Sequence, residues 1–360
     1  MNIPKKIKSA NIRLYPQKLW YDPEWIVLGV NNVCNLHCKM CDVGTQNLES
    51  NFAQNLVGTH PIHMPLELIK KVIDQQAQYF PNSKLAYAFT EPLVYRHLIE
   101  SLEYANQKGL FTTMTTNALT LKHKAEKLVK AGLNEIYISL DGPQDIHNEI
   151  RGHKSSFQKA LEGIEQLKSF PNAPKILIIC AITEWNVGHL KAFTDSFKDI
   201  NIEEIAFMHT QFADPQMAVL HNQMWGSKYP ATDSNLDEID LKNMNLPSLL
   251  EEINAIQRED YPFNIYFSPN LTNIESLTKY YHKPQEFIGK RCGAVFSSIM
   301  IKSDGSVIPA HGRCYNLTIG NLYEQPLKEI WNSQVIQRFR KDLLKAGGLF
   351  PGSSRCCSAF

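Results

Sequence analysis

The chain has 360 residues, of which 43% are hydrophobic and 20% are charged, and its formal net charge is +1. These values describe a globular protein with room for one large and one smaller domain, and they argue against bulk electrostatic binding to nucleic acid or anionic lipid. The longest apolar run, Ile176 to Ile182, is far too short to span a membrane, and no apolar stretch follows the N-terminal lysines. We therefore expect a cytoplasmic protein with neither nucleic-acid nor membrane partners.

Short β-rich runs alternate with amphipathic helical runs through the first two thirds of the chain. Several of the β-rich runs are almost continuously apolar, which is typical of parallel strands buried on both faces. We predict strands over Trp25–Val33, Lys84–Thr90, Phe111–Ala118, Asn134–Asp141, Lys175–Thr183, Ile202–His209 and Phe263–Ser268. The predicted helices are Pro65–Tyr79, Tyr95–Lys108, Leu121–Ala131, Ser155–Ser169 and Asn186–Phe197. This alternation predicts a parallel sheet built from β/α units.

The alternation changes after about residue 285. Two β runs flank the turn Ser303-Asp304-Gly305, and helical patterns follow over Glu324–Ser333 and Gln334–Lys345. The predicted fold is therefore a partial (β/α)6 parallel barrel followed by a small α+β C-terminal domain. We place an N-terminal extension at residues 1–25, the barrel at 26–285 and the C-terminal domain at 286–360.

Cys34, Cys38 and Cys41 form a C-x3-C-x2-C motif directly after the first predicted strand. Short-spaced thiolates hold iron–sulfur clusters, and three of them would ligate three irons of a cube and leave the fourth iron open. Structural zinc wants four nitrogen or sulfur ligands, and the nearest candidates for the fourth are Asp42, His60 and His63. The spacing favours the cluster over zinc.

This motif resembles that of the radical S-adenosylmethionine (SAM) enzymes, and later segments match the same family in order. Glu91-Pro92, at the end of the second predicted strand, is similar to the Gly-Gly-Glu-Pro motif, with Phe89 and Thr90 in place of the glycines. The resemblance implies a 4Fe–4S cluster with an open iron that binds SAM, and a set of SAM-binding residues: Met40, Thr90, Glu91, Asn117, Ser139, Asp141 and Arg151. In the family, the residue corresponding to Glu91 holds the amino group of SAM. Ser139 and Asp141 would lie near its ribose, Arg151 near its carboxylate and Met40 against its adenine.

Four more cysteines lie beyond residue 290, whereas Cys180 lies within an apolar strand. The spacing Cys292-x21-Cys314 and the surrounding turn and helix pattern resemble the twitch domain, a shortened SPASM domain that holds an auxiliary iron–sulfur cluster. By this resemblance, the ligands of a second 4Fe–4S cluster would be Cys292, Cys314, Cys356 and Cys357. The pair Cys356-Cys357 is adjacent where the family has C-x2-C, so the last ligand stays open between Cys357, His311 and a substrate atom. A zinc site, or no metal, is the alternative.

The resemblance implies that SAM is reductively cleaved to a 5′-deoxyadenosyl radical, which abstracts hydrogen from a substrate. A small polar substrate of the sugar or aminocyclitol type, oxidised or epimerised, is the first interpretation, because only about 25 residues precede the first strand. Modification of a peptide (cross-link, epimerisation or oxidation) is the second, and a non-catalytic metal-binding or redox-sensing protein is the third. A flavodoxin- or ferredoxin-type protein would supply electrons. Candidates for a catalytic acid or base are His209, Asp304, His311 and Tyr315.

Overall fold

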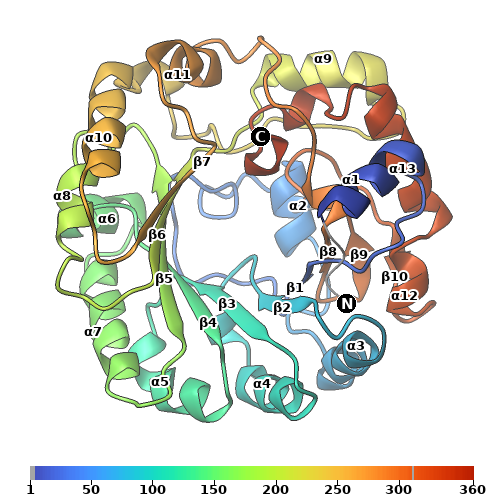
Figure 1. The fold of residues 1–360 in the computed structure, drawn as a ribbon, viewed down its shortest axis with the longest axis horizontal. Coiled ribbons are helices and arrows are strands. Elements are labelled where there is room, and N and C mark those ends of the chain that lie inside the picture. The colour runs from blue at the N-terminus through green and yellow to red at the C-terminus, as the bar shows by residue number, and fades with distance from the viewer. Residues whose placement is uncertain (1–4, 310–311) are drawn as a thin grey trace.

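A computed structural model describes residues 5–309 and 312–360 of the chain. Its centre is a single ten-stranded sheet in the order β10-β9-β8-β1-β2-β3-β4-β5-β6-β7. The strands are β1 (Trp25–Leu28), β2 (Lys84–Tyr87), β3 (Thr112–Thr116), β4 (Glu135–Ser139), β5 (Lys175–Ile182), β6 (Glu204–His209), β7 (Asn264–Ser268), β8 (Ser298–Ile301), β9 (Ser306–Ile308) and β10 (Gly320–Asn321). Strands β1 to β7 pair in parallel in chain order, and the sheet curls into an open barrel (Figure 1). The predicted partial barrel is confirmed.

The helices lie mainly on the convex outer side of this sheet, as α3, α4, α5, α7 and α8 do in Figure 1. The structure has α1 (Lys5–Leu14), α2 (Asn51–Val57), α3 (Leu66–Tyr79), α4 (Leu98–Gln107), α5 (Leu121–Lys130), α6 (Gln144–Ile150), α7 (Ser156–Lys168), α8 (Leu190–Asp195), α9 (Pro215–Trp225), α10 (Leu246–Arg258), α11 (Ile274–Tyr281), α12 (Leu327–Ile330) and α13 (Gln334–Lys345). None of the helices in the described ranges is long and apolar enough to cross a membrane.

The concave face of the sheet borders an open interior. Residues of β4 and β5 alternate between buried and partly buried positions, and Ala181 on the partly buried side of β5 lines a cavity. The expectation that these strands are buried on both faces is therefore wrong for β4 and β5. An inward face that stays partly open is what a ligand-binding barrel requires.

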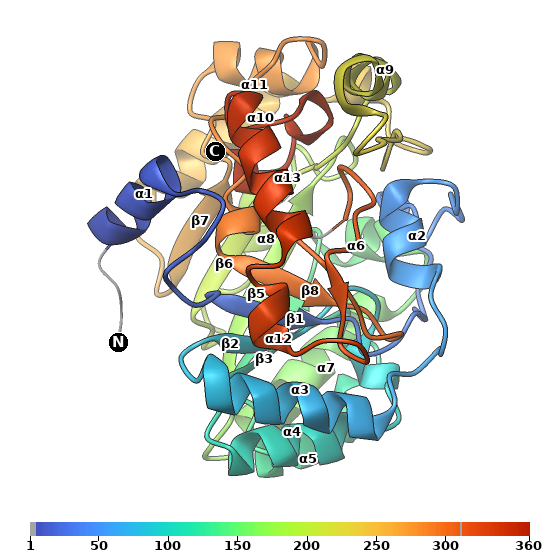
Figure 2. The ribbon, with the colours of Figure 1, turned by 90° about the vertical axis from the view of Figure 1, so that its right-hand side faces the viewer.

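The C-terminal part of the chain continues the barrel sheet. Strand β8 pairs in parallel with β1, from Trp25 opposite Ser298 to Leu28 opposite Ile301, and β9 and β10 extend the sheet in antiparallel fashion. Helices α12 and α13 lie beside these strands (Figures 1 and 2). The division of the chain at residues 25 and 285 stays a prediction. Strand β8 follows residue 285 but hydrogen-bonds to β1, so the two predicted domains share one sheet.

Asn332, after α12, joins the N-terminal segment to the C-terminal helices. Its side-chain amide donates to the carbonyl of Leu19 (3.1 Å), and its Oδ1 accepts from the Leu19 N–H (2.9 Å) and from Arg340 Nη1 (3.2 Å). The Arg340 guanidinium is buried 4.4 Å from the centre of the Trp331 ring. Asn332 is thus the shared partner of two segments that are more than 300 residues apart in sequence.

We expect Asn332→Ala to lower the free energy of unfolding by about 2 kcal/mol, because it leaves Leu19 and Arg340 without their partner. The measurement is the midpoint of urea unfolding. Asn243→Ala, at an exposed asparagine, is the control and should shift the midpoint little. Equal shifts for the two variants would show that Asn332 does not join these segments.

Candidate active site

Cys34, Cys38 and Cys41 lie in the loop after β1, at the carboxyl-terminal edge of the sheet, where reactive groups collect in α/β barrels. All three are unpaired thiols; Cys38 is buried and the other two are partly exposed. The loop backbone docks against the end of α6, where the N–H of Lys39 donates to the carbonyl of Ile150 (2.9 Å).

Two glycines permit the tight path of this loop. A Cβ atom at Gly44 would lie 2.3 Å from the carbonyl oxygen of Cys38, and one at Gly152 would lie 2.8 Å from that of His37. Gly152 also has a φ of +64°, which side chains other than glycine rarely adopt. The cysteine loop and the Arg151-Gly152 segment therefore fit together only with glycine at these two positions.

Donor groups face two of the three sulfurs. Arg151 Nη1 lies 3.7 Å from Cys38 Sγ, and Asn117 Nδ2 lies 4.0 Å from Cys34 Sγ. Burial raises the pKa of the Cys38 thiol to about 12, and the neighbouring Arg151 opposes this shift. Burial also raises the pKa of Cys34. Ligation by iron would replace these protons, because metal ligands are thiolates, and N–H donors stabilise sulfur that carries negative charge.

The donor set fits a cluster better than a zinc ion. Asp42 is completely buried, and its carboxylate accepts hydrogen bonds from Ser50 Oγ (2.8 Å), Ser234 Oγ (2.6 Å) and the Asn235 N–H (2.5 Å). It is thus not available as a fourth ligand. Among residues 5–309 and 312–360, no group of three or more His, Cys, Asp or Glu is arranged to hold a single metal ion. Three thiols on one short loop suit a cube, whose irons are spread apart.

The predicted SAM residues on β2 and β3 form a buried network. Glu91 is 1% exposed, and its carboxylate accepts from Thr116 Oγ1 (2.6 Å), the Asn117 N–H (2.8 Å) and the Leu93 N–H (2.8 Å). Thr90 Oγ1 donates to the side-chain oxygen of Asn31 (2.5 Å). Glu91 here joins the ends of two strands, so its contact with the amino group of SAM stays a prediction.

Phe89, which stands where the family has glycine, keeps the backbone conformation that glycine favours. Its φ is +87°, in the left-handed region that is uncommon for other residues. A residue with a large side chain therefore holds here a backbone conformation that glycine adopts more readily.

Asp141 positions Arg151. Asp141 is completely buried, and its carboxylate accepts from Arg151 Nε (2.5 Å) and from the Ala181 N–H (2.8 Å). His147 Nδ1 accepts from the Asp141 N–H (3.0 Å), and burial lowers the pKa of His147 to about 3. Ser139 ends β4 and is partly buried. Since both Asp141 oxygens already have partners, the roles of Ser139 and Asp141 at the ribose stay predictions.

The structure gathers the four C-terminal cysteines, although they come from separate segments. Cys314 and Cys357 each hydrogen-bond Cys356, which raises the pKa of both thiols. Burial and the nearby Cys356 raise the pKa of Cys292 to about 11. Ser358 Oγ lies 3.2 Å from Cys356 Sγ and 3.8 Å from Cys292 Sγ. The predicted ligand set is thus brought together. His311, the alternative ligand and catalytic candidate, lies outside the described residues.

One cavity is lined by a neighbour of each cysteine group, although no cysteine itself is among its described lining residues. Met40, next to Cys41, lines one side and Arg313, next to Cys314, lines another. The remaining described lining residues come from the ends of β5 and β6 and from the loops that follow: Ala181, Met208, His209, Thr210, Gln211 and Asn235. Sequence reasoning missed Gln211, Asn235 and Arg313, and the only signal for Arg313 was its position beside a predicted ligand.

Of the catalytic candidates in the described ranges, only His209 lines this cavity. Its Nδ1 lies 2.7 Å from the Tyr281 hydroxyl, and its buried Nε2 has no hydrogen-bond partner. Asp304 accepts from the N–H and hydroxyl of Ser306 within its own turn. Tyr315 is buried, hydrogen-bonds Cys292 and packs against Phe339.

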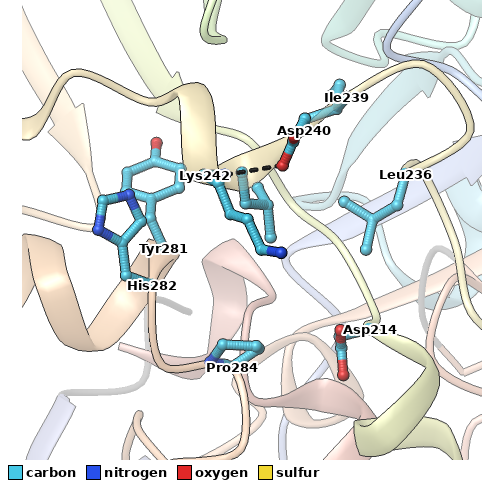
Figure 3. Close-up of a pocket in the computed structure, with 9 residues that line it drawn as sticks. Asp214, Leu236, Ile239, Asp240, Lys242, Tyr281, His282 and Pro284 are labelled. Atoms are coloured by element: carbon cyan, nitrogen blue, oxygen red, sulfur yellow. Dashed lines mark hydrogen bonds between the residues drawn. The ribbon is translucent and has the colours of Figure 1, made fainter.

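A larger hollow lies elsewhere, and none of the catalytic candidates is among its described lining residues (Figure 3). Its lining includes Asp214, Asp240, Lys242 and Tyr281, and Asp240 accepts from the Lys242 backbone N–H (3.0 Å). It lacks cysteines and the predicted SAM residues, so we take the smaller cavity beside Met40 as the candidate site.

We expect Asp42→Asn to lower the free energy of unfolding by about 2–3 kcal/mol, because an amide nitrogen cannot accept the bonds that the carboxylate accepts. The cysteine loop should loosen, and less iron should remain after reconstitution and desalting. Asp237→Asn is the matched control, since exposed Asp237 accepts from Thr45 and Asn47 of the same segment. If both variants keep the iron of the unmodified protein, Asp42 does not hold the loop.

Comparison with known families agrees with this geometry. The radical SAM superfamily matches residues 29–196, and the SPASM iron–sulfur cluster-binding domain matches residues 292–357. Fe-coproporphyrin III synthase of Methanosarcina barkeri is 24% identical over 339 residues, which are 89% of this chain and 78% of the relative.

Two groups of solved structures share the fold. SuiB of Streptococcus suis, bound to the precursor peptide SuiA, has a TM-score of 0.63 and 17% identity, over 92% of this chain and 69% of SuiB. Native anSMEcpe with bound AdoMet has a TM-score of 0.59 and 18% identity, over 88% of this chain and 82% of the other.

The two domain matches contain both cysteine groups, Cys34 to Cys41 in the first and Cys292 to Cys357 in the second. A 4Fe–4S cluster, SAM and additional iron–sulfur clusters are therefore the cofactors of this chain. The interpretation as a non-catalytic protein is wrong. The chain is an enzyme of the radical SAM superfamily that carries a SPASM domain.

Proposed function

We propose that this enzyme abstracts a hydrogen atom from a small polar substrate of the sugar or aminocyclitol type, bound in the cavity beside Met40, and that the outcome is oxidation or epimerisation. The observation that carries the proposal is the position of this cavity between Met40 of the first cysteine loop and Arg313 beside Cys314. When bound, the first cluster and SAM supply an electron and the 5′-deoxyadenosyl radical.

The residues of the cavity support a small, hydrogen-bonding substrate. Gln211 contributes an amide group, and His209 contributes a buried ring nitrogen without a partner. The Asn235 amide also lines the cavity, but it already accepts from the Asp42 N–H (3.2 Å) and donates to the Gln211 carbonyl (3.1 Å). Burial lowers the pKa of His209 to about 3, so its imidazole is neutral at pH 7 and is a weak base. We therefore assign His209 to hydrogen bonding with a substrate hydroxyl group.

The remaining predicted residues act around this cavity. Cys34, Cys38 and Cys41 would hold the SAM cluster, and Arg151, whose Nε donates to Asp141, would bind the carboxylate of SAM. Cys292, Cys314, Cys356 and Cys357 would hold a second cluster, whose place at the Arg313 end of the cavity favours oxidation. A flavodoxin- or ferredoxin-type protein is the proposed electron donor.

Radical modification of a peptide is the second candidate. It is favoured by the fold that this chain shares with SuiB, which was solved with a precursor peptide. The similarity to Fe-coproporphyrin III synthase over most of the chain adds tetrapyrroles to the substrates to be tested. A precursor-peptide reading frame beside the gene would support the peptide, and neighbouring sugar or amino-sugar enzymes would support the small molecule.

Anaerobic reconstitution with iron and sulfide, followed by dithionite and SAM, should yield 5′-deoxyadenosine and methionine. Replacing Cys34, Cys38 and Cys41 together by Ala should abolish this product, because the open iron is lost. Cys180→Ala is the control, since Cys180 is buried in β5, and it should keep the activity. Product formation by the triple variant, or none by the unmodified protein, would refute the proposal.

Iron analysis of the same triple variant tests the C-terminal cysteines. Roughly four irons per chain should remain, which corresponds to one auxiliary cube. Additional replacement of Cys314 and Cys356 should remove them. A triple variant that binds no iron, or that binds zinc in its place, would contradict a second cluster.

A further inference from the structure

We infer that the cavity beside Met40 binds a carboxylate group of the substrate and that Arg313 is the charged partner of this group. The inference rests on the proposed function in one respect, that this cavity holds the substrate. It narrows the substrate class from small polar molecules to those with a carboxylate.

The guanidinium of Arg313 is held in a fixed position. It lies 3.9 Å from the centre of the Phe52 ring, and Nη1 donates to Ser234 Oγ (3.1 Å). Ser234 Oγ in turn donates to the buried carboxylate of Asp42 (2.6 Å). Stacking and one hydrogen bond orient the group before any ligand arrives, and such preorganisation strengthens binding.

No carboxylate in the part of the chain that the structure describes pairs directly with Arg313, although its charge opposes the rise in the pKa of the nearby Cys357 thiol that the hydrogen bond to Cys356 and burial cause. No carboxylate there lies within 4.0 Å of its nitrogens, and Asp42 reaches it only through Ser234. Its Nε is buried and has no hydrogen-bond partner. Arg313 as a whole is partly buried, but a buried N–H donor without a partner is costly, so the site is suited to an anion that accepts from Nε.

The cavity also offers a second polar contact. His209, from β6, is 1% exposed, lines the same cavity and directs no hydrogen bond from Nε2 to the protein. A substrate held at Arg313 by its carboxylate can therefore place a hydroxyl group at His209 and a carbon toward Met40. Arg313 is the one cation among the described lining residues. Its planar, singly charged guanidinium matches a carboxylate, which has a single charge and two oxygens in one plane.

Binding of propionate, and of the neutral control propionamide, to the reconstituted holoenzyme tests the inference. Saturation-transfer NMR with SAM present and no reductant measures binding without turnover, so failed radical chemistry does not affect the result. We expect propionate to bind and propionamide to bind at least about tenfold more weakly. Arg313→Gln should weaken propionate binding by at least about tenfold, and Arg313→Lys should retain part of the affinity. The control is Arg338→Gln, at an exposed arginine of α13, which should bind propionate as the unmodified protein does.

Any of the following binding results would overturn the inference. The two probes bind equally well; Arg313→Gln binds propionate as the unmodified protein does; propionate binds only when SAM is left out, which would assign Arg313 to SAM; or phosphate, added as a third probe, binds more tightly than propionate. Iron counting separates a role at the cluster from a role in binding. We expect Arg313→Gln and Arg313→Lys to keep the iron of the unmodified protein, and loss of iron from both variants would assign Arg313 to the second cluster instead.

Discussion

The buried carboxylate of Asp42 is the interaction on which the candidate site depends. It follows Cys41 directly, and its three hydrogen bonds connect the cysteine loop to Ser50, which caps α2, and to the 234–235 segment. Through Ser234 the same network reaches Arg313, which also lines the cavity. A carboxylate surrounded by donors is stable when buried, and it holds together the segments that it joins. One side chain thus ties the first cysteine loop to α2, to the 234–235 segment and, through Ser234, to Arg313.

The pairing of β8 with β1 supplies the second constraint. Strand β1 leads into the loop that carries Cys34. It also pairs with β8, which precedes β9 and Cys314 in the chain. The C-terminal end is tied to this region as well, because the Cys292 N–H donates to the Gly348 carbonyl (2.9 Å) and the Gly293 N–H to the Ser358 carbonyl (2.8 Å). The two cysteine groups are therefore held by one continuous sheet. A rigid scaffold of this kind keeps a substrate in a productive position between two reactive groups.

The sequence predicted local features well and non-local ones poorly. Each predicted strand of the barrel is present, because apolar runs and the helices between them are local patterns. The β1–β8 pairing joins residues about 270 positions apart, and no local pattern encodes it. Glu91 and Asp141 were recognised from motifs, but their hydrogen bonds to Thr116 and Ala181 became visible only in the fold. Arg313 belongs to no recognised motif. Its role as a binding residue is inferred from its contacts with Phe52 and Ser234, which are distant from it in sequence.

The cavity beside Met40 is expected to lie next to two iron–sulfur sites that one sheet holds. Anomalous diffraction at the iron edge, from crystals of the anaerobically reconstituted protein with SAM, would locate both sites. We expect one iron site at Cys34, Cys38 and Cys41, a second at the C-terminal cysteines, and SAM next to Met40, with the space beside Arg313 left open. A single iron site, zinc at either position, or SAM filling the space at Arg313 would contradict this expectation.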